Sequence, residues 1–305
     1  MKKIAISIGD LNGVGIEIAL KAHNEIKKII KPIYIINQYM LNQASKLLNT
    51  PIPDDFEIYE ISAKFEIKPG IVDSKAGLYS FNSFITAINL AKEKKVDGIC
   101  TLPINKESWA KAGIKYHGHT EVLRDIFKKD AIMMLGCSDM YVALFTEHIA
   151  LKEVPNKIQK NKLVKFFIDF YNSTKFNKID VLALNPHASD GGVMGDEEEK
   201  EILPAIKEAN KILNKHIFYG PLVPDTAFTS KKGNFIAMYH DQGLAPLKSL
   251  YFDRSINVSL NLPILRTSVD HGTAFDIAYQ NKANTKSYIE AIKYHINYDK
   301  INQKG

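Results

Sequence analysis

The sequence predicts an α/β fold built around a largely parallel β-sheet. Short apolar runs rich in β-branched residues alternate along the chain with longer stretches in which apolar residues recur every three or four positions. The first pattern is typical of buried strands and the second of amphipathic helices. Their alternation indicates that helices connect the strands of a parallel sheet.

The individual elements follow from these two patterns. The expected strands, in chain order, are residues 4–8, 33–36, 98–101, 132–135, 141–145, 181–184, 235–239 and 256–259. The expected helices are residues 17–23, the stretch that contains Met40 and Leu47, and residues 78–91, 156–171, 197–210, 273–279 and 287–295. Trp109 and the apolar stripe of 78–91 are expected in the core. Glu197, Glu198 and Glu199 are expected to cap their helix, because acidic groups suit a helix N-terminus.

Composition limits the class of protein. The 305 residues include 45% hydrophobic and 24% charged residues, which excludes wholesale disorder. The 40 Lys and Arg exceed the 34 Asp and Glu by only six, and no basic patch is interleaved with aromatic residues, so neither a nucleic acid nor a membrane is an expected partner. Cys100 and Cys137 lack disulfide or metal-site spacing and no apolar window is long enough to cross a membrane, so a cytoplasmic location is expected.

Polar residues follow several of the expected strands, and three of them are histidines. His148, His187 and His240 each come shortly after a strand, and the carboxyl ends of strands are where open α/β sheets bind ligands. Three neutral imidazoles can hold a divalent metal ion. Their spacing matches no local metal-binding motif, so only the fold could bring them together. A hydrogen-bonded or surface histidine is the alternative for each.

Two further features have a functional and a structural interpretation. The glycine-rich turn 9–15 could approach an anion at a helix N-terminus, or it could simply be a tight strand-to-helix turn. Lys248, Arg254 and Arg266 flank Asn257 in an otherwise apolar stretch. These cations could bind phosphate or carboxylate, or they could form a solvated basic face.

Seven short segments occur in an order that identifies a family. They are residues 9–15 (GDLNGVG), 101–106 (TLPINK), 118–121 (GHTE), 185–188 (NPHA), 220–228 (GPLVPDTAF), 238–243 (MYHDQG) and 257–274. Together they cover most of the chain and resemble the 4-hydroxythreonine-4-phosphate dehydrogenase family of pyridoxal phosphate biosynthesis. The resemblance implies the α/β/α two-subdomain fold of the isocitrate and isopropylmalate dehydrogenase type, with the active site in the cleft between the subdomains. The subdomains are expected to interleave, roughly as residues 1–118 plus 268–305 and residues 119–267.

The resemblance also implies site residues. The family's metal ligands fall on His148, His187 and His240, at the interface of a homodimer whose two subunits share the site. The substrate-binding positions fall on His119, Thr120, Lys248, Asn257 and Arg266. The stretch DHGTAFDIA is similar to the loop of isopropylmalate and isocitrate dehydrogenases that approaches the adenosine half of NAD. The implied cofactor-binding residues are therefore His271, Gly272, Thr273 and Asp276.

The implied reaction is an NAD-dependent and divalent-metal-dependent oxidation of 4-phosphooxy-L-threonine. The β-keto acid that forms would lose carbon dioxide and leave 3-amino-2-oxopropyl phosphate, for pyridoxine 5′-phosphate synthesis. His119 and Asp241 are both candidates for the catalytic group that takes the hydroxyl proton, and the metal could be zinc, magnesium or cobalt. A sister dehydrogenase acting on 4-phospho-threonate or 4-phospho-erythronate is the alternative, and a phosphate acyltransferase is a more remote one.

Some positions depart from the family pattern. Leu11 and Ile16 replace prolines of the first segment, and Tyr279 stands where the related dehydrogenase loop has glycine. Glu147 precedes His148 where threonine is common, and a carboxylate there could orient the imidazole. We expect Leu11 and Ile16 to affect the turn 9–15, and Tyr279 to affect the cofactor side.

Overall fold

The computed structural model describes residues 1–302, with side chains as far as Tyr298, and its contacts form two compact units. Unit 1 comprises Met1–Lys129, Ile256–Val258 and Leu262–Asn297, and unit 2 comprises Asp130–Ser255, Ser259–Asn261 and the residues from Tyr298 on. The segment 119–129, expected in the second subdomain, groups with unit 1, because Val122 and Leu123 are buried in the core of that unit. The subdomain limits themselves stay a prediction, and their last residues, 303–305, lie outside the described part.

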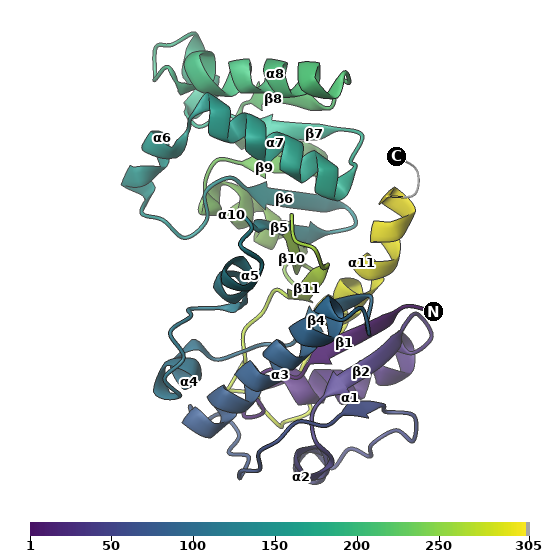
Figure 1. The fold of residues 1–305 in the computed structure, drawn as a ribbon. Coiled ribbons are helices and arrows are strands. Elements are labelled where there is room, and N and C mark those ends of the chain that lie inside the picture. Colours follow the sequence, from purple (N-terminus) through teal and green to yellow (C-terminus); the bar gives the residue numbers. More distant parts are fainter. Residues whose placement is uncertain (303–305) are drawn as a thin grey trace. The chain divides into compact units, whose positions relative to one another are not determined.

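The central strands of the sheet in unit 1 all pair in parallel. Its strands run in the order β3-β2-β1-β4-β11, and β10 follows β11. β1 pairs in parallel with both β2 and β4, and β4 pairs in parallel with β11 (Figure 1). The bounds are β1 Lys3–Ser7, β2 Lys31–Ile35, β3 Ile58–Tyr59, β4 Gly98–Thr101, β10 Ile256–Leu260 and β11 Arg266–Val269.

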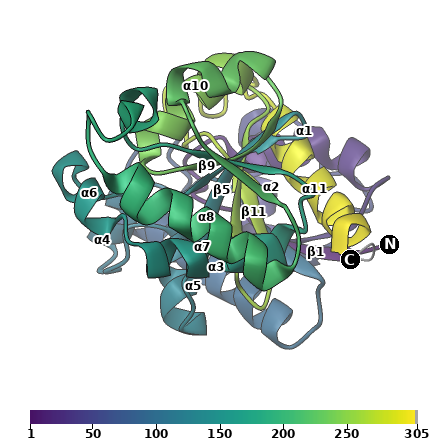
Figure 2. The same ribbon diagram turned by 90° about the horizontal axis from the view of Figure 1, so that it is seen from above.

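Side-chain caps begin three helices of unit 1. The side chain of Asn37 accepts a hydrogen bond from a backbone N–H of α2, and Asp73 and Asn105 do the same for α3 and α4. Figures 1 and 2 show α3 on one face of the sheet and α1 and α11 on the other. The bounds are α1 Gly15–Ile26, α2 Gln38–Leu48, α3 Ser74–Lys92, α4 Lys106–Lys111, α5 His119–Phe127 and α11 Lys286–Asn302.

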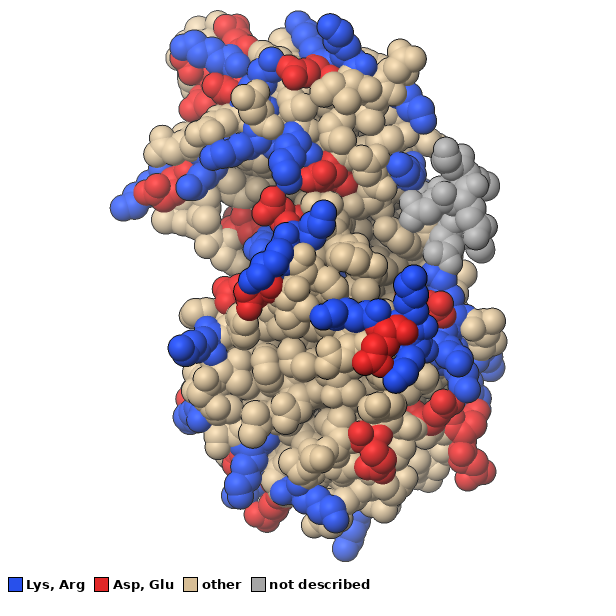
Figure 3. Space-filling view, viewed as in Figure 1, with Lys and Arg blue, Asp and Glu red and all other residues tan. Residues whose placement is uncertain are grey.

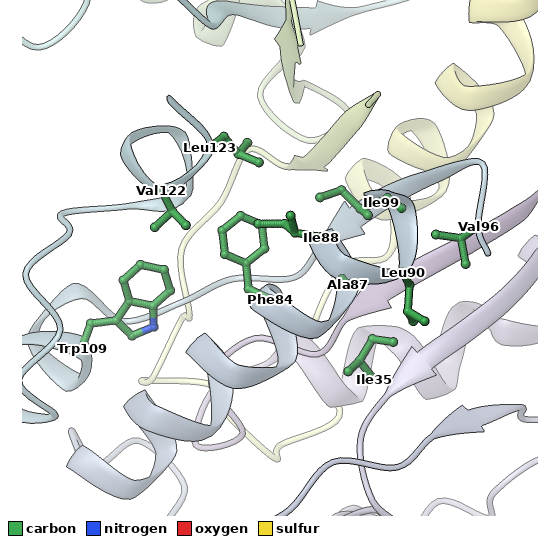
Figure 4. Packing of buried hydrophobic residues seen from close by; sticks show 12 residues of the cluster. Ile35, Phe84, Ala87, Ile88, Leu90, Val96, Ile99, Trp109, Val122 and Leu123 are labelled. Atoms are coloured by element: carbon green, nitrogen blue, oxygen red, sulfur yellow. The ribbon is translucent and has the colours of Figure 1, made fainter. Parts of the chain in front are cut away.

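The core of unit 1 lies between α3 and the sheet. Phe84 and Ile88 of α3 are fully buried among side chains of the strands and of α4 and α5 (Figure 4). Trp109 is buried in the same cluster, where its Nε1 donates to Oγ of Ser80 over 2.8 Å. A buried indole needs such a partner for its N–H. The prediction that Trp109 and the stripe of 78–91 pack in the core is confirmed for Trp109, Phe84, Ile88 and Ala91, but it is wrong for Leu78, which is 47% exposed at the start of the stripe.

Unit 2 contains a second group of strands, in the order β5-β6-β9-β7-β8. β5 and β6 form an antiparallel hairpin, whereas β9 pairs in parallel with both β6 and β7, and β7 pairs in parallel with β8. The bounds are β5 Ile132–Cys137, β6 Met140–Leu144, β7 Ile179–Leu182, β8 Phe218–Leu222 and β9 Gly233–Ala237.

Helices cover both faces of these strands. Figures 1 and 2 show α7 and α8 on one face and α10 on the other. Leu244 and Leu247 of α10 are buried against apolar side chains of β5, β6 and β9. The bounds are η1 Leu151–Glu153, α6 Val154–Lys157, α7 Lys160–Thr174, η2 Pro186–Asp190, η3 Glu198–Ile202, α8 Leu203–Leu213, α9 Pro224–Ala227, η4 Phe228–Ser230 and α10 His240–Tyr251.

The predicted α/β class with a largely parallel sheet is confirmed, and one predicted helix is wrong. Residues 273–279 form turns, because Ala274 and Tyr279 have left-handed φ angles of 44° and 62° that a right-handed helix cannot contain. The strands β3, β8 and β11 and the helices α4, α5, α9 and α10 were not expected from the sequence.

The distribution of charged side chains on the surface reflects the nearly equal numbers of basic and acidic residues in the sequence. On the face drawn in Figure 3, Lys and Arg side chains are interspersed with Asp and Glu. Within residues 1–302, no helix combines the length and the apolar character that a membrane crossing requires.

Candidate active site

The three predicted metal-binding histidines follow three adjacent strands of unit 2. His148 comes after β6, His240 after β9 and His187 after β7, and β9 pairs in parallel with both of its neighbours. The carboxyl ends of these strands therefore meet at one edge, and ligands bind at such edges in α/β proteins. The strand order places the histidine that comes last in the sequence between the other two.

His148 and His240 lie close together at this edge. Their ring centroids are 5.5 Å apart, with an angle of 42° between the ring planes. Nδ1 of His240 lies 2.6 Å from Oδ1 of Asp241. An ionised carboxylate can only accept a hydrogen bond, so Nδ1 carries the proton, and in the neutral imidazole Nε2 keeps the lone pair that a metal ion requires. This donor set fits two ligands of a divalent metal ion, and it places Asp241 as the group that orients the imidazole of His240.

His187 lies in a strained segment. It belongs to η2, in which His187, Ala188 and Ser189 have φ angles of 52°, 52° and 72°. Residues other than glycine rarely adopt this left-handed region. In the part of the chain that the structure describes, no three His, Cys, Asp or Glu side chains are grouped to hold a metal ion. One chain therefore brings together two of the three predicted ligands, and His187 as the third stays a prediction.

Buried polar side chains connect the strand ends that carry these histidines. Gln242 accepts a hydrogen bond from Met238 N over 2.7 Å and donates to the carbonyl of Ala183 over 2.6 Å, which joins the ends of β9 and β7. Oγ1 of Thr146 donates to the carbonyl of Met238 over 2.6 Å, which joins the ends of β6 and β9. The edge is thus held by side chains as well as by the sheet.

The expectation that Glu197, Glu198 and Glu199 cap their helix is wrong for Glu198. No side chain caps the start of η3, and the carboxylate of Glu198 instead accepts hydrogen bonds from Leu184 and Asn185. The reason is the position of Glu198 beside the end of β7, where two backbone N–H groups lack a strand partner. Nothing in the local sequence reveals this contact, because its partners lie 13 and 14 residues earlier.

Unit 1 contains a buried cation that is surrounded by predicted substrate-binding residues. Arg266, on β11, is 3% exposed. Its guanidinium donates to Oγ1 of Thr101 over 2.7 Å, lies 3.1 Å from Nδ1 of His119 and lies 3.5 Å from Oδ1 of Asn257. The hydroxyl of Thr101 and the amide of Asn257 carry no charge, and burial keeps the imidazole of His119 neutral. The three groups therefore orient the guanidinium without cancelling its charge. Burial lowers the pKa of Arg266 to about 10, which still leaves the side chain charged at neutral pH.

His119 is placed to donate a hydrogen bond at this site. Because a guanidinium can only donate, Nδ1 of His119 accepts and Nε2 carries the proton. Burial, together with the charge of Arg266, lowers the pKa of His119 well below its usual value, so the ring is neutral. Nε2 is buried without a hydrogen-bond partner among the described residues. A buried donor without a partner is costly in a folded protein and often marks a place for a ligand.

The other predicted substrate residues are distributed over both units. Thr120 follows His119 in the first turn of α5, and Lys248 lies on α10 in unit 2. Sequence reasoning gave no role to Thr101, although it ends a strand within the segment TLPINK, a position typical of binding residues. The structure thus groups His119, Asn257 and Arg266 and adds Thr101 to them.

The predicted cofactor-binding residues form a loop that packs on the glycine-rich turn. The N–H of Val14 donates to the carbonyl of Thr273 over 3.0 Å, and a Cβ at Gly13 would lie 2.8 Å from the same oxygen. The structure therefore supports the interpretation of this turn as a tight strand-to-helix connection. Its glycine is needed for the close approach of the loop.

This loop retains groups that fit a ligand. Nε2 of His271 is buried without a hydrogen-bond partner within residues 1–302, and no atom lies within 4 Å of the place where a Cβ of Gly272 would be. Asp276 is exposed. Tyr279, which replaces the glycine of the related loop, donates from its hydroxyl to the carbonyl of Leu11 over 2.7 Å. Two of the departures from the family pattern, Leu11 and Tyr279, are thus in contact with each other.

Comparison with known proteins gives consistent results. Residues 19–295 match the family described as pyridoxal phosphate biosynthetic protein PdxA. The 4-hydroxythreonine-4-phosphate dehydrogenase of Campylobacter fetus is 60% identical over 97% of this chain and 98% of its own, and that of Sulfurimonas denitrificans is 62% identical over 95% and 96%. The crystal structure of 4-hydroxythreonine-4-phosphate dehydrogenase from Klebsiella pneumoniae is 30% identical, with a TM-score of 0.82 and coverage of 97% and 98%.

Proposed function

The chain belongs to the PdxA family of pyridoxal phosphate biosynthesis, and from this premise we propose that it is a 4-hydroxythreonine-4-phosphate dehydrogenase. In the proposed reaction, C3 of 4-phosphooxy-L-threonine loses a hydride to NAD⁺ and its hydroxyl loses a proton, which gives NADH and a β-keto acid. The bond to the carboxylate then breaks, carbon dioxide leaves, and protonation of the carbon gives 3-amino-2-oxopropyl phosphate. A cytoplasmic location is proposed, because both cysteines are buried free thiols, as a reducing compartment permits.

The observation that carries the proposal is the buried Arg266 with its neighbours. The guanidinium, held by Thr101, His119 and Asn257, keeps its positive charge and can attract an anionic group of the substrate. The Nε2–H of His119 can donate to a substrate oxygen at the same place. We propose that Thr120 and Lys248 complete the substrate contacts. These groups would fix the reacting carbon and so lower the entropic part of the barrier.

We propose that His148, His187 and His240 hold one divalent metal ion, zinc, magnesium or cobalt. Support comes from the 5.5 Å separation of the His148 and His240 rings and from the contact between Asp241 and Nδ1 of His240. When bound, such an ion lowers the pKa of a coordinated hydroxyl and stabilises negative charge on its oxygen. Asp241 would keep His240 in the tautomer that binds the ion. In this arrangement His119 donates to the substrate, and Asp241, whose Oδ1 already accepts from His240, could take the hydroxyl proton only through its other carboxylate oxygen.

We propose that His271, Gly272, Thr273 and Asp276 bind NAD. The unpartnered Nε2 of His271 and the open face of Gly272 support this assignment among the described residues. NAD, when bound, supplies the hydride acceptor that no protein side chain can provide. The glycine-rich turn would fix the loop through its contact with Thr273.

A homodimer with shared sites is the proposed assembly. It is supported by the pairing of only His148 with His240 within the described part of one chain. Mixing the His187→Ala and His240→Ala variants provides a test, because heterodimers would contain one intact set of ligands. Restored activity in the mixture is the expected result, and a fully active monomer would exclude the shared site.

The decisive experiment measures NADH formation from 4-phosphooxy-L-threonine and NAD, after chelation and after metal is added back. Activity that returns with metal is the expected result. If metal and NAD both bind but no NADH forms, the sister substrates 4-phospho-threonate and 4-phospho-erythronate become the better assignment. If neither binds, the dehydrogenase proposal fails and the acyltransferase alternative replaces it.

A further inference from the structure

Glu198 is a buried carboxylate whose hydrogen bonds all go to the segment that leads to His187. Its side chain is 2% exposed. Oε1 accepts from the N–H groups of Leu184 and Asn185 over 2.7 and 2.8 Å, and Oε2 accepts from Nδ2 of Asn185 over 2.9 Å. A carboxylate removed from water needs such compensation, so these three bonds hold the carboxylate and the segment together.

The segment with His187 has little other regular structure to fix it. It leaves β7 after Leu182, and the four successive residues from His187 to Asp190 are left-handed. No helical or strand ladder positions a backbone of this shape, so its course depends on how its ends are held. On the β7 side, Gln242 binds the carbonyl of Ala183, and Glu198 binds the next two residues.

The far end of the segment is also tied down. Oγ of Ser189 donates to the carbonyl of Gly195, and Asn185 Nδ2 donates over 2.7 Å to Oε2 of Glu197, next to Glu198. The start of η3 and the segment 185–189 therefore form one hydrogen-bonded group. Glu198 is its most buried acidic member, and it makes the only contacts described for the two backbone N–H groups that precede Pro186.

We propose that Glu198 is a positioning residue for metal binding, which holds the backbone at Leu184 and Asn185 so that His187 is presented as a ligand. This inference rests on the metal site of the proposed function. Glu198 does not contact the ion itself and acts through two backbone positions. Residues that orient metal ligands from behind commonly change metal affinity by about 10- to 100-fold when they are replaced.

The test compares three variants of the full-length protein. Glu198→Ala removes all three hydrogen bonds, and Glu198→Gln keeps an oxygen for the two backbone N–H groups but turns an amide donor toward Asn185. Glu199→Ala is the matched control, because Glu199 is the exposed neighbour in the same element. The readouts are the dissociation constant for Zn²⁺, by competition with a chelator, and hydrogen exchange of residues 180–195 in the metal-free protein.

The expected results are graded. Glu198→Ala should weaken Zn²⁺ binding by about 10- to 100-fold and speed the hydrogen exchange of residues 180–195. For Glu198→Gln, both the Zn²⁺ affinity and the exchange rate should lie between those of Glu198→Ala and the wild type. Both values for Glu199→Ala should match those of the wild type. A folded Glu198→Ala protein with wild-type Zn²⁺ affinity would overturn the inference while leaving the metal site intact. If Glu198→Ala does not fold, Glu198→Gln decides, and wild-type affinity in that variant overturns the inference. A wild-type protein that binds no Zn²⁺, Co²⁺ or Mg²⁺ would refute the metal site itself.

Discussion

Asp10 is a buried carboxylate whose ionisation should oppose folding at neutral pH. It is fully buried, and Oδ1 accepts from the N–H of Asn12 over 2.9 Å. Hydrogen bonding from Asn12 and Ser108 favours the ionised form but does not offset the effect of burial on the pKa. Burial raises the pKa of Asp10 from 3.8 to about 6. A difference of about two pKa units corresponds to about 3 kcal/mol between the protonated and ionised forms.

The sign of the effect follows from proton binding. A raised pKa means that the folded state holds the proton more tightly than the unfolded state. Well below pH 3.8 both states are protonated and the carboxylate contributes no destabilisation. As the pH rises from 4 to 6 the unfolded state loses its proton first, so stability falls, and above pH 6 the full destabilisation of about 3 kcal/mol is present.

The Asp10→Asn variant tests this reasoning, because an amide cannot ionise and can still accept from Asn12. We expect it to be more stable than the wild type at pH 7.5, by up to about 3 kcal/mol, and to show no such gain at pH 3.5. Urea unfolding at both pH values gives the two differences in free energy. The exposed Asp54→Asn change is the matched control and should give no pH-dependent difference. The same difference for Asp10→Asn at both pH values would refute the argument.

Three further substitutions test the contacts around the proposed site. Gly13→Ala places a Cβ 2.8 Å from the carbonyl oxygen of Thr273, so urea unfolding should show a loss of roughly 1–3 kcal/mol, and NADH fluorescence titration should show weaker binding. Thr101→Val removes the hydroxyl that holds Arg266 and should raise KM for the phosphorylated substrate roughly tenfold, whereas Thr101→Ser should not; equal KM values would contradict this role. Tyr279→Phe removes one hydrogen bond and should cost about 1 kcal/mol of stability, and an unchanged midpoint in urea would show that the bond contributes nothing.

The spacing of apolar residues predicted those helices and strands in which a continuous row of side chains is buried. The stripe of 78–91 predicted α3, Ser74–Lys92, and the apolar run before Leu102 predicted β4 at its observed bounds, because burial determines both patterns. Short elements such as β3 and α9 carry too few residues to show a period. The expected helix 273–279 failed because packing on the glycine-rich turn, including the contact of Val14 with Thr273, overrides local preference.

Site residues could be predicted from the sequence where the side chain alone, such as a guanidinium, indicates what it can bind. Arg266 was a candidate anion binder from its charge and surroundings alone, and the structure places it beside His119 and Asn257. The roles of Thr101 and Glu198 could not be predicted, because a hydroxyl or a carboxylate acquires such a role only from partners that are distant in sequence. The pairing of His148 with His240 likewise depends on the pairing of β6 with β9.

The strand order of unit 2 makes the three histidines unequal. Neighbouring strands lie about 4.8 Å apart, so the ends of β6 and β7, on either side of β9, are separated by about twice that distance. Within one chain, the strand that leads to His240 therefore lies between the strands that lead to His148 and His187. The ring of His240 contacts that of His148, but among the described residues the sheet alone does not bring His187 into the same group. The third ligand of the proposed site must therefore come from a change in the course of the His187 segment or from the partner subunit of the proposed homodimer.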